Sequence, residues 1–62
     1  MKVRYRDKVW EFDGRMTVRQ VREQVDLIPE AALAVRDDQL LAEDTVLEKD
    51  EEVRFVAVIS GG

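Results

Sequence analysis

The feature that most constrains the fold of this chain is the absence of any covalent or metal staple. The 62 residues include no cysteine and no histidine, so neither disulfides nor the usual thiolate and imidazole metal sites can form. A domain of this size buries only about 60% of the surface that its unfolded chain exposes. Hydrophobic packing must therefore hold the fold together, and we expect one small domain, residues 1–59, followed by a flexible tail, residues 60–62.

Composition and charge exclude several functional classes. Apolar residues make up 45% of the chain, as in an ordinary globular protein, whereas charged residues make up 39%, well above the usual quarter or so, which favours a folded and highly soluble domain. With 14 acidic and 10 basic residues the formal net charge is -4, so there is no basic field for nucleic-acid binding. No signal peptide and no membrane-spanning run is visible, and we expect a cytoplasmic protein without a membrane partner.

The two signs of charge are unevenly distributed along the chain. Residues 1–25 hold seven basic and four acidic side chains, whereas residues 26–52 hold ten acidic and two basic ones. This asymmetry can steer the acidic half toward a basic patch on a partner. The alternative is a solvated acidic face without a partner.

Hydrophobic patterning predicts the order strand, strand, helix, strand, strand, with one more short element before the last long strand. Residues 2–6 and the run around Trp10 and Phe12 alternate in character, as the strands of a hairpin do. Thr17 and Gln20 have the spacing of a capping box at the start of a helix. The apolar stripe of this helix consists of Val18, Val21 and Val25, and Pro29 ends the helical pattern.

The second half of the chain reads as strands separated by acidic turns. Residues 33–36 and 39–41 predict two strands around a turn at Asp37 and Asp38, and residues 45–47 predict a single helical turn. The strongest strand is residues 53–59, in which Val53, Phe55, Ala57 and Ile59 are expected to face the helix. Arg54, Val56 and Val58 then lie on the open face, where the two valines form either a docking patch or ordinary exposed aliphatics.

A self-contained catalytic site is not expected. Histidine, the usual proton shuttle, and cysteine, the readiest nucleophile, are both absent, and the carboxylates cluster in turns beside Lys and Arg. The only glycines are Gly14, Gly61 and Gly62, so there is no loop that can cradle a phosphate.

The chemistry is expected instead at the tail Ser60, Gly61 and Gly62. Glycine has no Cβ, so an extended tail of this kind can enter a channel that excludes other residues. The ionised carboxylate of Gly62 can attack the α-phosphorus of ATP to give an acyl-adenylate, with catalysis supplied by a partner. A persulfide sulfur or a lysine amine can then displace AMP.

Several motifs together resemble the ThiS/MoaD family. They are the strand order around the helix, Thr17 and Val18 at the helix start, Ala34 and Val35 before a turn, residues 44–47 and the final residues 58–62. The resemblance implies an α+β, ubiquitin-like β-grasp fold, with a mixed sheet of four to five strands packed on one main helix. Asp37 and Asp38 stand where such carriers often have Asn-Gly, and Glu51 stands where a glycine often precedes the last strand.

The resemblance also implies a function and a set of partners. Gly62 would be adenylated by an ATP-dependent adenylyltransferase of the ubiquitin-activating (ThiF/MoeB-like) type and then thiocarboxylated, with Ser60 and Gly61 threading the enzyme. A cysteine desulfurase or rhodanese would donate the sulfur, and a synthase of a thiamine-type or tRNA-thiolation pathway would accept it. The chain itself would bind no cofactor and would not be an enzyme, and Arg54, Val56 and Val58 would contact the partner.

Two other functions stay open at this stage. The same acyl-adenylate permits a protein modifier that is conjugated through Gly62 to lysines of other proteins. The chain can also be a non-covalent β-grasp interaction module in which the terminal glycines are incidental.

Overall fold

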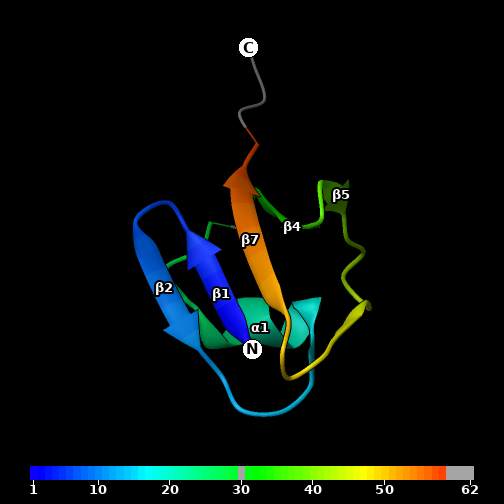
Figure 1. Cartoon of the computed structure of the whole chain (residues 1–62). Helices are drawn as coiled ribbons and strands as arrows, with labels where there is room; N and C mark the ends of the chain where they lie inside the picture. The colour runs from blue at the N-terminus through cyan, green and yellow to red at the C-terminus, as the bar shows by residue number, and fades with distance from the viewer. Residues whose placement is uncertain (30, 59–62) are drawn as a thin grey trace.

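The computed structural model of the chain describes residues 1–29 and 31–58, which form a mixed sheet of five strands packed on one helix. In Figure 1 the helix lies behind the sheet and leaves the opposite face of the sheet open. The strand order is β2-β1-β7-β4-β5, in which β1 and β7 are parallel and the other neighbours are antiparallel. The expected α+β architecture with a mixed sheet, consistent with a β-grasp fold, is confirmed.

Seven strands and one helix make up the described structure. Two of the strands, β3 and β6, form a separate small sheet. The bounds in chain order are β1 Lys2–Tyr5, β2 Lys8–Glu11, β3 Met16–Thr17, α1 Val18–Gln24, β4 Ala32–Arg36, β5 Gln39–Leu40, β6 Val46–Leu47 and β7 Glu52–Ala57.

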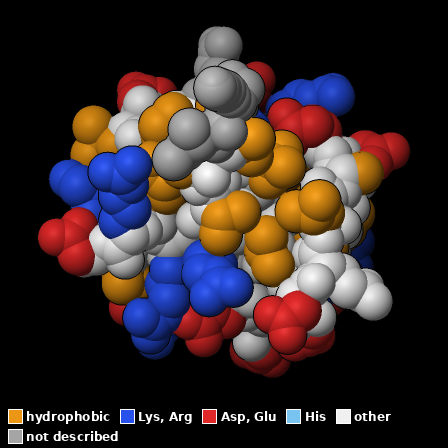
Figure 2. Space-filling model, turned by 90° about the horizontal axis from the view of Figure 1, so that it is seen from above, with side chains coloured by type: hydrophobic (Ala, Val, Ile, Leu, Met, Phe, Trp, Pro, Cys, Tyr) orange, Lys and Arg blue, Asp and Glu red, His pale blue; other side chains and the backbone are white. Residues whose placement is uncertain are grey.

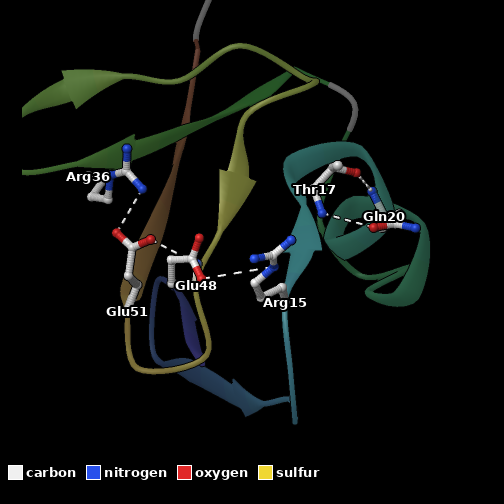
Figure 3. Close-up of polar contacts among 6 residues, drawn as sticks. All are labelled: Arg15, Thr17, Gln20, Arg36, Glu48 and Glu51. Carbon is white, nitrogen blue, oxygen red and sulfur yellow. Dashed lines mark hydrogen bonds and ion pairs between the residues drawn. The ribbon is translucent and has the colours of Figure 1, made fainter.

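The helix α1 begins where the sequence predicts it, because Thr17 and Gln20 form a reciprocal capping box (Figure 3). The backbone N–H of Gln20 donates to the Thr17 hydroxyl at 3.1 Å, and the backbone N–H of Thr17 donates to the Gln20 side-chain oxygen at 2.9 Å. Each bond satisfies an amide that the first helical turn leaves without an intrahelical acceptor. The two residues therefore fix the start of the helix.

The apolar stripe of α1 is confirmed, although the helix is shorter than the pattern suggests. Val18 and Val21 are fully buried, and Val25 is buried as the C-cap residue. The helix ends at Gln24, and the N–H of Val25 still donates to the carbonyl of Val21 at 3.0 Å. A separate turn follows before Pro29, so the proline is not the residue that ends the helix.

The core lies between α1 and the covered face of the sheet. Its side chains come from the helix, from three adjacent strands of the sheet and from β6, which closes one side. The buried apolar residues are Val3, Tyr5, Val18, Val21, Val25, Ile28, Ala32, Ala34, Leu47, Val53 and Phe55.

The turn between β4 and β5 adopts an unusual backbone. Asp37 and Asp38 have φ angles of 53° and 64°, and Arg36 pairs with Gln39 across them. Positive φ at both central residues is what a two-residue type I′ hairpin turn requires, and Asn-Gly is the pair that fits it best. The predicted turn is therefore confirmed, with two aspartates in a conformation that favours Asn and Gly.

The predicted helical turn at residues 45–47 is wrong. Val46 and Leu47 form β6, an antiparallel pair with Met16 and Thr17 of β3. The strand fixes Leu47 in the core, where it is fully buried, while Val46 faces outward. An apolar run of three residues does not distinguish a strand from a helical turn, because the deciding partner lies about thirty residues earlier in the chain.

Two further details of the last strands differ from the sequence prediction. Ala57, expected to face the helix, is exposed at the end of β7. A helix of seven residues is about 10 Å long, whereas six strand residues span about 20 Å, so α1 cannot cover the whole of β7. Strand β5 ends at Leu40 rather than at Leu41, and the part of the prediction that concerns Ile59 lies outside the described residues.

Candidate functional site

The last described residue before the tail is fixed to the sheet. The N–H of Val58 donates to the carbonyl of Ala31 at 3.2 Å, which continues the contact between β7 and β4 beyond Ala57. The three predicted site residues Ser60, Gly61 and Gly62 lie outside the described residues. Their roles therefore stay predictions, and the described part of the site is the surface from which the tail departs.

An apolar patch lies on the open face of the sheet beside this point. Val56 is half-buried and lies directly opposite Leu33 of β4. Leu33 is 38% exposed and Val58 is 43% exposed. Figure 2 looks onto the end of the molecule toward which β7 runs, and apolar side chains gather near the middle of this surface, with Lys and Arg side chains in separate groups beside them. The sequence predicts Val56 and Val58 on the open face of the sheet but does not identify Leu33.

The strand register brings five side chains into one row across the whole open face. Arg4 lies opposite Val9 on one side and opposite Arg54 on the other, and Val35 lies between Arg54 and Leu40. Leu40 is 67% exposed. Apolar side chains therefore end the row on both edges, with two adjacent arginines near its centre. The sequence singled out only Arg54, because the other four residues join it through strand pairing that no local pattern encodes.

A shallow hollow on this face is lined by charged side chains of both signs. Arg4 forms an ion pair with Glu52, and Arg36 Nη1 lies 2.7 Å from Glu51 Oε2. Among residues 1–29 and 31–58, no carboxylate lies within ion-pair distance of Arg54. The residues that line the hollow are Arg4, Val35, Arg36, Asp37, Asp38, Glu52 and Arg54.

Polar contacts organise the turn at the opposite end of β7 (Figure 3). Glu51 accepts a bond of 2.8 Å from the backbone N–H of Glu48 as well as the bond from Arg36. The backbone N–H and the guanidinium both favour the ionised carboxylate, and together they hold the pKa of Glu51 below its usual range despite an opposing effect of burial. Arg15 adds a looser ion pair with Glu48 at 3.9 Å.

A second groove runs along the part of β4 that β5 does not cover. It is lined by Arg22, Leu33, Leu41, Ala42 and Glu43. Arg22 Nη2 lies 3.2 Å from Glu43 Oε2, and its guanidinium carbon lies 5.2 Å from the centre of the Phe55 ring. These contacts tie α1 to the segment before β6 and cover one edge of the core, which indicates a structural role for the arginine.

Within residues 1–29 and 31–58, no three acidic side chains come close enough together to hold a metal ion. No helix in the same part of the chain is long and apolar enough to cross a membrane.

Comparison with known proteins points in one direction. No family model matches the chain. A curated protein, described as the sulfur carrier protein TtuB of Thermus thermophilus, is 33% identical to it over 52 residues. The aligned segment covers 84% of this chain and 80% of the relative, so the similarity extends over most of both proteins.

Proposed function

Because the chain belongs to the ThiS/MoaD family of ubiquitin-like sulfur carriers, we propose that it carries sulfur as a thiocarboxylate on its C-terminal residue, Gly62. The observation that carries the proposal is the 33% identity to a sulfur carrier over 84% of the chain. The five-stranded mixed sheet, whose last strand leads directly toward the tail, is in keeping with it.

The proposed chemistry begins with adenylation of the carboxylate. A carboxylate oxygen of Gly62 attacks the α-phosphorus of ATP, and pyrophosphate leaves to give an acyl-adenylate. The terminal sulfur of a persulfide then attacks the acyl carbon, AMP leaves, and an acyl disulfide forms. A further thiol reduces this disulfide, which releases the thiocarboxylate on Gly62 and a disulfide between the two thiol partners.

The proposed partners supply every catalytic group for this series of reaction steps. An ATP-dependent adenylyltransferase of the ubiquitin-activating type, similar to ThiF and MoeB, would carry out the first step. A cysteine desulfurase or a rhodanese would supply the persulfide, and a synthase for a thiamine-type cofactor or a tRNA thiolase would accept the sulfur. The chain would act as their substrate and not as an enzyme.

Docking of the adenylyltransferase is proposed to involve the open face next to the tail. Val58 is exposed, and its backbone N–H is bonded to the chain next to β4. Val56 lies opposite Leu33, and Arg54 lies on the same face of the sheet, two residues before Val56 on β7. Contact at this surface would place the tail against the partner, because only four residues separate Val58 from the carboxylate. Fully extended, four residues reach about 14 Å at most.

Intact-mass spectrometry tests the proposed function. The protein is produced together with an adenylyltransferase of this type and a persulfide donor from its own organism, and the mass of the chain is compared with that of a variant lacking Gly62. We expect the full chain to gain the mass of one sulfur in exchange for one oxygen, and the shortened chain to stay unmodified. An unmodified full chain, with enzymes shown to be active on another carrier, would contradict the proposal.

A further inference from the structure

The charged side chains of the hollow that form no ion pair with other described residues have opposite signs at two places. Three charged side chains that line the hollow are engaged in ion pairs: Arg4 pairs with Glu52, and Arg36 pairs with Glu51, which does not line the hollow. The remaining charged groups are Arg54 on β7 and the pair of aspartates in the turn between β4 and β5. The hollow therefore presents one cation near the centre of the sheet and two anions at one edge, and in the neighbouring row of the same face Lys2 lies opposite Glu11.

Arg54 is placed where its charge is poorly compensated inside the molecule. Its Cα partner in the parallel pair of β1 and β7 is Arg4, a side chain of the same sign. Its Cα partner on the other side is Val35, which is apolar and half-buried. Like charges directly opposite one another on a sheet are unfavourable, and the ion pair of Glu52 is made with Arg4.

The apolar surface around these charges makes them effective in recognition. Leu33, Leu40 and Val58 are exposed on or beside the same face, so a partner that covers them also removes water from the charged groups among them. A desolvated charge without a counter-charge is costly, whereas a matched one fixes orientation and register. Two charges of opposite sign on one face distinguish the correct orientation of a partner from the reversed one.

We propose that the adenylyltransferase docks on this face through an apolar surface of its own. In the complex, a carboxylate of the enzyme lies against Arg54, and a lysine or arginine of the enzyme lies against Asp37 and Asp38. This inference rests on the proposed function and adds the charge pattern that sets the orientation of the complex. In that orientation Val58, and with it the start of the tail, lies under the partner. The electrostatic contacts act in binding, while the carboxylate of Gly62 acts in the reaction.

The test measures how adenylation depends on the concentration of this protein. Isotopic exchange of pyrophosphate into ATP by the adenylyltransferase of the same organism gives a KM for the carrier and a rate at saturation. Arg54→Glu changes the formal net charge from -4 to -6, and the double variant Asp37→Asn with Asp38→Gly changes it to -2. The double variant keeps the turn, because Asn-Gly is the favoured pair for type I′ geometry.

Matched controls carry the same changes of charge away from the open face. Arg19→Glu also gives a net charge of -6, and Glu23→Gln with Asp26→Asn also gives -2. Arg19 and Glu23 are exposed on α1, and Asp26 is exposed just after it, on the covered side of the sheet. Circular dichroism melting confirms that each variant is folded.

Arg54→Glu and the double variant at Asp37 and Asp38 are both expected to raise the KM, although they change the net charge of the protein in opposite directions. Both should raise the KM by about threefold to tenfold with little change in the rate at saturation, and both controls should match the wild type. Steering by net charge alone would instead change the KM in opposite directions for Arg54→Glu and for the double variant. Each control would then show the same KM as the open-face variant of equal net charge, and this result would overturn the proposal.

Two other outcomes separate this inference from its premise. Pyrophosphate exchange with the wild type and unchanged KM values for both variants would overturn the docking proposal and leave the carrier function standing. No exchange with the wild type, under conditions where the enzyme adenylates another carrier, would overturn both. Sedimentation analysis that shows a wild-type dimer dissociated by Arg54→Glu would assign the face to contact between copies and would also overturn the docking proposal.

Discussion

Arg36 Nη1 donates a hydrogen bond of 2.7 Å to Glu51 Oε2 and thereby ties the end of β4 to the turn before β7. The same carboxylate accepts from the backbone N–H of Glu48 through its other oxygen, so both oxygens are held by charge-stabilising donors. The turn thus uses the Glu51 side chain to close the loop before β7. The arrangement makes Glu51 the titrating group with the clearest link to stability.

Replacement of Glu51 by Gln should lower stability at neutral pH and have less effect in acid. The pKa of Glu51 is below its usual range in the folded protein, so the ionised form stabilises the fold at pH values above the unfolded pKa of about 4.3. This contribution is lost as the pH falls through the lowered folded pKa. We expect a loss of about 1 kcal/mol at pH 7 for Glu51→Gln, measured by urea unfolding.

The comparison must be repeated across the pH range with a matched control. Glu23→Gln removes the same charge from an exposed position on α1 and should show a small difference from the wild type that varies little with pH. A difference between Glu51→Gln and wild type that stays constant from pH 7 to the acid limit of folding would show that the ionised carboxylate is not the stabilising form.

The turn at Asp37 and Asp38 should become more stable when it receives the residues that its backbone favours. Both aspartates have positive φ, and Gly adopts this region without the steric cost that a Cβ imposes. The double variant Asp37→Asn with Asp38→Gly should raise the free energy of unfolding by about 1 kcal/mol. Thermal melting measures the gain, and Asp37→Ala with Asp38→Ala, which removes the same charges but not the strain, should not show it.

Leu47 should be the residue that most clearly tests the position of β6. It is fully buried against the core, so Leu47→Ala should cost about 3 kcal/mol, a large share of the stability of so small a protein. Leu27 is 62% exposed, and Leu27→Ala should change the free energy of unfolding by less than about 0.5 kcal/mol. Similar effects of the two substitutions would show that the segment around Leu47 does not pack as described.

The parts of the fold that the sequence predicts are those governed by local chemistry. Thr17 and Gln20 are three residues apart and satisfy each other's backbone groups, and the valines of α1 are spaced by whole helical turns. The β4 to β5 turn likewise depends on two adjacent residues. In each case the residues that form the pattern lie within about seven positions of one another, so the pattern is visible without knowledge of the fold.

The parts that the sequence does not predict depend on distant pairing. β6 exists because it pairs with β3, and a local apolar run does not reveal that partner. The row on the open face requires the parallel register of β1 and β7, which places Arg4 beside Arg54 across about fifty residues of sequence. The candidate site is divided in the same way: the chemistry proposed for Gly62 follows from the residue types of the tail, whereas the row of side chains around Arg54 depends on strand pairing.

Substitution of Gly61 should separate the chemical role of the tail from the binding role of the sheet. A β-branched side chain at this position fits a narrow channel poorly, because Gly is the one residue without a Cβ. Gly61→Val should therefore lower the rate of pyrophosphate exchange at saturating protein by about tenfold or more, with a KM close to that of the wild type. Arg54→Glu should show the converse pattern, and Ser60→Ala, which leaves both glycines in place, should retain most of the rate. A rise in KM for Gly61→Val without a fall in the saturated rate would mean that the tail contributes to binding rather than to placement of the carboxylate.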